Sequence, residues 1–285
     1  MNYAKNYNRK AKAKEIYEKV LNNVQNIVKN GEYAKYLKFQ NQFTKYSFNN
    51  IVLIYSQFPD ATNVAGKSKW KEIGRELIEG AKSIQITAGM PAQGKTKVKK
   101  VIDGKEVEEE QTYNYIAYKQ VYVYDISQTV GEPIPLEVKM LDSKNMGSFF
   151  DKLKQFSKFP IYEENLYGGL KGFYSPKNKT ITIDKKLSID AKVAVLLHEL
   201  THGIYDDFDY KTDKNLSETF VESVAYIVAD YFGLDNSMCS FNYIVQYANG
   251  NPNILIDLGT KIKKCASEFI KDIEEFEVQE ERLVA

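Results

Sequence analysis

Both histidines of this 285-residue chain lie in one five-residue window, His198-Glu199-Leu200-Thr201-His202. On an α-helix, residues four positions apart lie one turn apart on the same face, so both imidazoles can bind one metal ion. Glu199 lies on the adjoining face, where it can act as general base toward a metal-bound water. The spacing therefore predicts a zinc site in which His198 and His202 are ligands and Glu199 is the catalytic residue of a peptidase.

A catalytic zinc ion usually has three protein ligands, and this chain has no third histidine. The next predicted helix, residues 215–233, offers two glutamates. Glu222 borders the apolar stripe of that helix, beside Ala225 and Ala229, whose small side chains permit close helix approach. We therefore prefer Glu222 as the third ligand. Glu218 lies in the first turn, where it could serve in a capping box, support the ligands or replace Glu222.

Other oxygen and sulfur ligands nearby are weaker alternatives. The aspartates of the loop that follows the histidines are expected to be solvated or to cap helices, and Cys239 is a distant third choice. The loop aspartates are Asp206, Asp207, Asp209 and Asp213.

The predicted metal ligands need a buried helix and a support beside it. Residues 190–204 are apolar on nearly every side, which is typical of a buried helix, and Ser188 or Asp190 can cap its start. Before it, residues 172–174 and 180–184 read as the strands of a β-hairpin. An extended peptide could pair with an exposed edge of this hairpin, although a purely structural hairpin is equally compatible with the sequence.

Elsewhere the pattern predicts helices over 10–30, 47–58, 67–74 and 146–157, and strands over 83–88 and 113–127. Residues 92–112 are polar and charged, with Asp103-Gly104 as a hairpin-turn signal. Two or three further helices are expected after residue 233. The fold class is therefore α+β.

Charge divides the chain into two parts. Residues 1–145 carry 23 Lys and Arg against 16 Asp and Glu, whereas the remainder carries 16 against 22. Glycines and prolines gather between residues 130 and 147. We place a domain boundary there, which gives a basic domain over residues 1–140 and an acidic, mainly helical domain over residues 141–285. A basic half often binds a polyanion, although a solvated lysine-rich surface explains the charge equally well.

Two segments of the basic half mix cations, amides and aromatic rings, a combination that suits single-stranded nucleic acid. On residue chemistry alone, the simpler alternative is favoured: Phe48 and Trp70 are core residues and the lysines around them are solvated. The predicted nucleic-acid contacts are Lys45, Tyr46, Asn49, Asn50, Lys67, Lys69, Trp70, Lys71 and Arg75.

The composition excludes several classes of protein. Apolar residues make up 43% of the chain and charged residues 27%, which fits a soluble globular protein rather than a disordered or collagen-like one. No apolar run is long enough for a transmembrane helix, and the basic start lacks the apolar core of a secretory signal. Two cysteines are too few for a disulfide framework. A cytoplasmic protein with no membrane partner is expected.

Several long segments resemble ArdC-type antirestriction proteins of plasmids and conjugative elements. Residues 46–75 and 121–135 are similar to the N-terminal domain of that family. The segments HELTHGIY, ETFVESVAYIVADYFGL and FNYIVQYANGNPNILIDLGTKIKKCASEFI are similar to its zincin-like metallopeptidase domain. The resemblance covers most of residues 10–275, and the charged stretch at 92–112 departs from it.

The resemblance implies a single-stranded-DNA-binding N-terminal domain and a C-terminal zinc peptidase fold related to the ImmA/IrrE group. In that group the glutamate of a Glu-x-x-Ala segment is the third ligand, and Glu222-Ser-Val-Ala225 matches it. The implied role is protection of incoming DNA from host restriction. The pairing of a DNA-binding domain with a peptidase domain leads to the separate hypothesis that DNA-bound host proteins are its substrates. Two alternatives stay open. One is a DNA-masking protein with a structural zinc site, and the other is a regulatory protease that cleaves a repressor.

Overall fold

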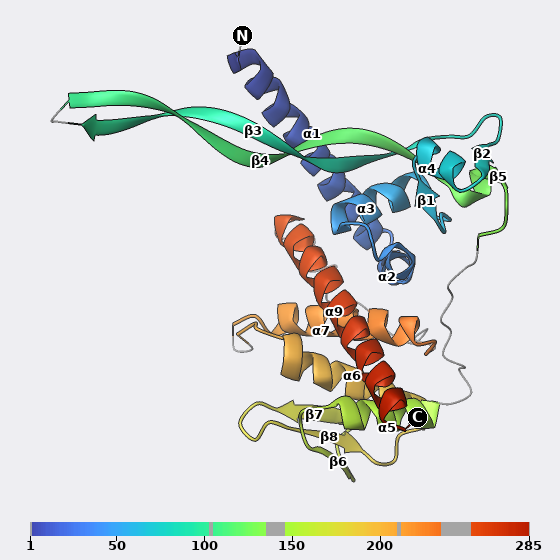
Figure 1. Ribbon diagram of the computed structural model, residues 1–285. Helices are drawn as coiled ribbons and strands as arrows, with labels where there is room; N and C mark the ends of the chain where they lie inside the picture. Colours follow the sequence, from blue (N-terminus) through green and yellow to red (C-terminus); the bar gives the residue numbers. More distant parts are fainter. Residues whose placement is uncertain (1, 103–104, 135–145, 210–211, 235–251, 285) are drawn as a thin grey trace. The chain divides into compact units, whose positions relative to one another are not determined.

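The protein is described by a computed structural model, shown in Figure 1. It describes residues 2–102, 105–134, 146–209, 212–234 and 252–284. The chain forms two compact units, each built from two stretches of sequence. Unit 1 comprises Met1–Tyr17 and Leu53–Pro133, and unit 2 comprises Glu18–Val52 and Ile134–Ala285.

Both helices and strands occur among the described residues, so the chain has the mixed helix and strand content that the sequence predicts. Up to residue 134 the elements are α1 (Asn2–Lys29), α2 (Tyr33–Gln40), η1 (Asn41–Phe43), α3 (Phe48–Gln57), β1 (Val64–Ala65), α4 (Lys67–Glu72), β2 (Arg75–Leu77), β3 (Ile84–Ile102), β4 (Lys105–Asp125), η2 (Ile126–Gln128) and β5 (Thr129–Gly131). After residue 145 they are α5 (Met146–Phe156), β6 (Ile161–Glu164), β7 (Gly172–Ser175), β8 (Thr180–Asp184), α6 (Ile189–Tyr205), α7 (Lys214–Tyr231) and α9 (Pro252–Val284).

Unit 1 contains a long two-stranded ribbon, visible as the twisted pair β3 and β4 in Figure 1. The strands pair antiparallel from Ile84↔Val123 to Ile102↔Lys105, and β1 pairs with β4 at the base. Ile84, Ile86 and Val123 are buried on one face of the base, so apolar packing supports this end of the ribbon. The polar residues 92–112 are thus largely strand, and Asp103-Gly104 lie outside the described residues.

Cross-strand side chains stabilise the outer part of the ribbon. Lys95 pairs with Glu110, and Lys97 pairs with Glu108, each across 2.9 Å. The ring of Tyr113 lies so close to Gly94 that a Cβ there would collide with it. Exposed ion pairs contribute little individually, so these contacts set the strand register more than they add stability.

Unit 2 holds a three-stranded sheet in the order β6-β8-β7, with β6 parallel and β7 antiparallel to the central β8. Ile181 and Ile183 of β8 are fully buried, and α6 contacts both β7 and β8. Helix α6 also packs on α5 and α7. The predicted hairpin and the predicted buried helix at 190–204 are both present. Strand β6 has no counterpart in the sequence prediction.

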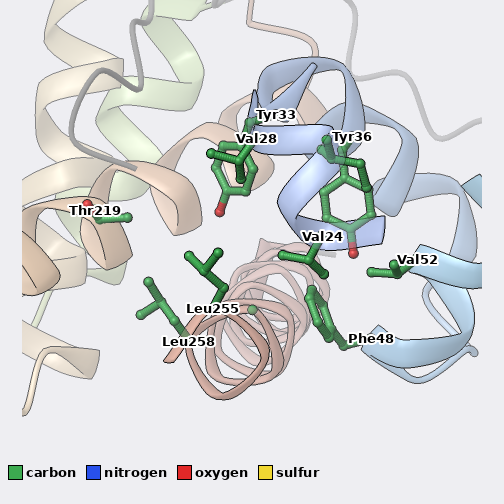
Figure 2. A pocket seen from close by; sticks show the side chains of 11 residues that line it. Val24, Val28, Tyr33, Tyr36, Phe48, Val52, Thr219, Leu255 and Leu258 are labelled. Atoms are coloured by element: carbon green, nitrogen blue, oxygen red, sulfur yellow. The ribbon is translucent and has the colours of Figure 1, made fainter. Parts of the chain in front are cut away.

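The N-terminal stretch of unit 2, Glu18–Val52, packs against helices from the end of the chain. The Asn41 side-chain amide donates to the Ile227 carbonyl at 3.0 Å and to Asp230 at 2.8 Å. Figure 2 shows side chains that line a small cavity where the two stretches meet, among them Tyr33 and Phe48 of the first stretch and Leu258 of the second. Its volume is about 20 Å³, so this core is nearly close-packed.

Parts of the sequence prediction fall on residues outside the described ones. These are most of the proposed boundary at 135–147 and residues 235–251, which include Cys239. The proposed division into residues 1–140 and 141–285 stays a prediction, and it differs from the compact units in where it puts residues 18–52. Among the described residues, no helix combines the length and apolarity needed to cross a bilayer.

Candidate metal centre

Two helices bring three potential ligand atoms together. Helix α6 begins where the Ser188 hydroxyl accepts the backbone N–H of Ala191, and it carries both histidines one turn apart. From α7, Glu218 Oε2 lies 3.5 Å from His198 Nε2 and 3.8 Å from His202 Nε2. The ligand atoms of the three residues all lie within 4.8 Å of one another.

The structure differs from the sequence prediction in the third residue of this cluster. We expected Glu222 as ligand and Glu218 as its support or substitute, whereas Glu218 completes the cluster. The two glutamates lie one turn apart on α7, so helix periodicity puts both on the same side. Which one reaches the histidines depends on how far α7 is shifted along α6, and the sequence does not specify that shift.

Asp206 orients one of the histidines. His202 Nδ1 lies 2.8 Å from Asp206 Oδ2, which also accepts the hydroxyl of Ser217 at 2.6 Å. The other oxygen, Oδ1, accepts the backbone N–H of Phe208 at 3.1 Å. A proton on Nδ1 leaves Nε2 free to bind a metal, so this carboxylate selects the tautomer that a ligand needs. From the sequence alone, Asp206 is expected to be solvated or to cap a helix, so this orienting role is a finding of the structure.

Glu199 is held beside the cluster on the sheet side of α6. Its side chain is 7% exposed, and its Oε2 accepts the backbone N–H of Tyr174 in β7 at 2.8 Å. Burial raises the pKa of Glu199, although the two neighbouring histidines and this hydrogen bond oppose the shift. A buried carboxylate of raised pKa next to a metal cluster has the position and the basicity of a general base.

The carboxylate and imidazole groups of the cluster shift one another's pKa values. Hydrogen bonds from His198 and His202 hold the pKa of Glu218 well below its usual range. Burial disfavours the imidazolium form of His202, but the hydrogen bonds with Asp206 and Glu218 outweigh it and raise the pKa of His202 to about 9. Without a metal, the paired carboxylates thus favour a proton on this histidine.

A cavity of about 260 Å³ adjoins the cluster. His198 and Glu199 form part of its wall, and Glu222 lies there as well. Burial raises the pKa of Glu222. The preferred third ligand is therefore a wall residue of the cavity, close to the cluster although not within it.

The predicted nucleic-acid contacts of unit 2 have mixed surroundings. Lys45 is exposed, whereas Asn49 and Asn50 are half-buried at the start of α3. The half-buried Tyr46 ring packs edge-on against Phe43, with ring centroids 6.0 Å apart. In this group only Lys45 is exposed to solvent.

The predicted contacts of unit 1 separate into exposed and structural residues. Lys67, Lys69 and Lys71 are exposed on α4, and Lys69 pairs with Glu72. Trp70 is 1% exposed, and its indole N–H donates to the Tyr124 carbonyl at 2.9 Å. The prediction that this ring stacks on bases is therefore corrected: Trp70 is a core residue.

Arg75 is also structural rather than free for phosphate. Its guanidinium donates to the Thr129 hydroxyl at 2.8 Å, to the Thr129 carbonyl at 3.1 Å and to the carbonyls of Gly131 and Glu132. These bonds join β2 to β5 and to the residue after it. The assignment of Arg75 as a nucleic-acid contact is corrected on this ground.

The donor set of the cluster fits a divalent metal ion. Two imidazole nitrogens and one carboxylate oxygen are ligands that zinc accepts, and imidazole with carboxylate also suits other first-row divalent ions. Nitrogen–oxygen separations of 3.5 and 3.8 Å are close to those between ligands of one tetrahedral ion with bonds of about 2.0–2.2 Å. The chain thus has a candidate set of ligands for a divalent metal ion.

Comparison with known proteins places this chain near ArdC. Residues 8–124 match the model of the N-terminal domain of anti-restriction factor ArdC. Two crystal structures of antirestriction ArdC protein from R388 plasmid share the fold. The metal-free form is 16% identical with a TM-score of 0.51, covering 81% of this chain and 86% of that one. The Mn(II)-bound form is 14% identical with a TM-score of 0.58, covering 91% and 97%.

A protein of Bacillus anthracis, uncharacterized protein pXO2-81, is 25% identical over 316 residues. The match covers 96% of this chain and 53% of that protein, so the chain spans about half the length of this relative. Taken together, these findings show an ArdC-like protein, whose residues 8–124 match the model of the ArdC N-terminal domain.

Proposed function

We propose that this chain is an antirestriction protein in which a zinc-dependent peptidase site accompanies a surface for single-stranded DNA. The observation that carries the peptidase part is the cluster of His198, His202 and Glu218 next to Glu199 and a cavity. A site for metal storage or structure has no need of a buried carboxylate and open space beside the ligands.

The residues have distinct roles in peptide hydrolysis. His198, His202 and Glu218 would hold a divalent ion, which when bound polarises a carbonyl and lowers the pKa of water. Glu199 accepts a proton from the attacking water and returns it to the leaving amine. Asp206 keeps the His202 ring in the required tautomer.

Strand β7 gives an extended peptide a place beside this site. It pairs with β8 on one side and is the edge strand of the sheet. Lys171 and Gly172, where β7 begins, line the cavity together with His198 and Glu199. A peptide paired with this edge would run past the general base, because main-chain hydrogen bonds to a sheet edge hold a substrate extended.

Glu199→Gln tests the peptidase proposal. We expect the variant to keep its metal, measured by elemental analysis, and to lose hydrolysis of a fluorogenic peptide mixture by about 10²–10⁴-fold. Glu163→Gln is the control, since Glu163 is a glutamate of β6 that pairs with Lys154 and Lys192. Hydrolysis by Glu199→Gln at the rate of the unmodified protein would contradict the role of Glu199.

The same variant separates the two accounts of antirestriction. A catalytic account expects Glu199→Gln to lose protection of DNA in a transfer assay. Unchanged protection would instead support the alternative, a DNA-masking protein with a non-catalytic metal site.

For the DNA surface we propose exposed residues of unit 1 in place of Trp70 and Arg75. Tyr118 and Tyr122 are 66% and 55% exposed, and their even spacing in β4 puts both rings on one face of the ribbon. Lys67 and Lys71 of α4 are exposed cations, and α4 contacts β4. Rings for stacking and cations for phosphates are what a single strand requires.

Tyr118→Ala or Tyr122→Ala should each weaken binding of a labelled single-stranded oligonucleotide by about 1–3 kcal/mol, because a stacking ring is lost. Tyr113→Ala is the control, because Tyr113 lies on the other face of the same strand. Binding should also weaken steeply with salt. An affinity for single strands no higher than for an unrelated acidic polymer would refute the DNA surface.

A further inference from the structure

The cavity beside the metal cluster owes its space to three alanines. Ala194 lies on α6 one turn before His198, and Ala225 and Ala229 lie one turn apart on α7. Ala225 and Ala229 are only 8% and 2% exposed, so they are built into the wall between packed helices. A leucine at any of these positions would fill space that is now open.

The backbone of β7 closes the cavity from the sheet side. Gly172 lies against α6 so closely that a Cβ at this position would collide with Val195 and approach the Thr182 carbonyl to 3.0 Å. Only a residue without a side chain permits this approach. At Gly172, therefore, strand β7 lies directly against α6 and forms part of the cavity wall.

The cavity is continuous with the reactive groups. His198 and Glu199 belong both to its wall and to the metal cluster with its base. A carbonyl placed between the metal ligands and Glu199 would therefore lie beside this cavity. The side chain that occupies the cavity therefore influences which peptide bond lies next to the metal ligands and Glu199.

Size and polarity indicate what the cavity accepts. Its volume of about 260 Å³ exceeds an apolar cavity of about 150 Å³ that binds benzene in another protein. Apart from Lys171, Glu222 and the site's own residues, the wall consists of alanine, valine, glycine and Tyr226. An aromatic or long aliphatic side chain matches both the volume and the apolar walls of the cavity. A small side chain leaves part of the volume unfilled, and a charged one does not match the apolar walls.

We propose that this cavity is the specificity pocket of the site, and that it receives a large apolar side chain of the substrate next to the scissile bond. Ala194, Ala225 and Ala229 set its size. The identity of the ligand as a peptide rests on the proposed peptidase function. The pocket itself can be tested without hydrolysis.

The test uses hydroxamates, whose metal-binding group is constant while the side chain varies. Affinities of phenylalanine, glycine and arginine hydroxamate for the zinc-loaded full chain are measured by calorimetry. We expect the phenylalanine compound to bind at least tenfold more tightly than the glycine compound, because burial of a phenyl ring favours binding by that much or more. Equal affinities, or tightest binding of the arginine compound, would overturn the assignment.

Variants locate the effect in the cavity. Ala229→Leu should bring the phenylalanine-to-glycine ratio close to one while leaving the glycine hydroxamate affinity unchanged. Ala194→Leu, at a half-buried position, should do the same where Ala229→Leu fails to fold or bind zinc. Ala191→Leu is the matched control on α6, outside the cavity, and should keep the ratio. An unchanged ratio in the folded cavity variants would refute the proposal.

A peptide mixture randomised at one position separates this inference from the proposed function. Preferential cleavage next to Phe, Leu or Met, lost in the leucine variants, supports both. Discrimination among the hydroxamates without cleavage of any peptide contradicts the peptidase proposal but supports the apolar pocket. Cleavage without side-chain preference supports the peptidase and overturns the pocket.

Discussion

Asparagine in place of Asp206 removes a charge behind His202 of the candidate metal cluster with little change in the size of the side chain. In the native protein, Oδ2 serves His202 Nδ1 and the Ser217 hydroxyl, while Oδ1 accepts the Phe208 N–H. An amide has only one acceptor oxygen. If that oxygen faces His202, the amide NH₂ faces the N–H of Phe208, and two donors oppose each other.

The expected loss follows from the role of such partners in metal sites. Carboxylates that support a histidine ligand typically contribute 10–100-fold to metal affinity, which corresponds to about 1.4–2.7 kcal/mol. The Asp206 side chain is 9% exposed, so solvent can replace its contacts only in part. We therefore expect Asp206→Asn to fall within this range for both Zn²⁺ and Mn²⁺.

Competition with a chromogenic chelator at fixed pH measures the affinity. Asp207→Asn is a matched control, because the adjacent aspartate is 78% exposed and pairs with Lys261 instead of a ligand. Urea unfolding of the metal-free proteins shows whether both variants fold. If Asp206→Asn is unfolded, Ser217→Ala removes one donor to the same carboxylate and should produce a smaller loss of affinity. Equal metal affinity in Asp206→Asn, Asp207→Asn and the unmodified protein would refute the orienting role.

Three other perturbations test neighbouring conclusions. Glu218→Gln should weaken metal binding more than Glu222→Gln in the same chelator assay, and the opposite order would identify Glu222 as the ligand. Trp70→Ala should lower the free energy of unfolding by about 3–5 kcal/mol in urea, as loss of a buried ring does, and a stable variant with weakened DNA binding would contradict its core assignment. Gly259→Ala places a methyl group against the Phe48 ring. It should destabilise the protein by about 1–3 kcal/mol in thermal unfolding, although alanine ordinarily stabilises a helix, and a stabilised variant would show that the core can relax.

Local patterns in the sequence predicted the parts of the site that depend on one helix. The spacing of His198 and His202 fixes their common face because helix geometry is the same everywhere, and Ser188 caps the helix as expected. Asp206 could have been found by the same logic, since it follows His202 by four residues. It was missed because it lies just past the helix end at Tyr205, and the sequence did not show that the chain still turns back there.

Features that depend on how two elements pack against each other were harder to predict from the sequence. The choice between Glu218 and Glu222 follows from the position of α7 along α6, which no pattern within α7 encodes. For Trp70, residue chemistry alone favours a core position and the resemblance favours a binding surface; the ring is buried and its N–H donates to the Tyr124 carbonyl, as the first alternative expects. Alternation of apolar residues revealed the base of the ribbon, but polar residues 92–112 carry no apolar face from which a strand could be recognised.

The second compact unit is assembled from stretches that are distant in sequence. The hydroxyls of Tyr33 and Ser223, 190 residues apart, lie 3.2 Å from each other. During synthesis the ribosome therefore releases one side of this core long before the helix that completes it. Recombination that joins foreign sequence after residue 124, where the ArdC N-terminal match ends, would separate α2 from its partner α7. The unit that carries the candidate metal cluster therefore cannot be exchanged as one contiguous segment, because residues 18–52 belong to it as well.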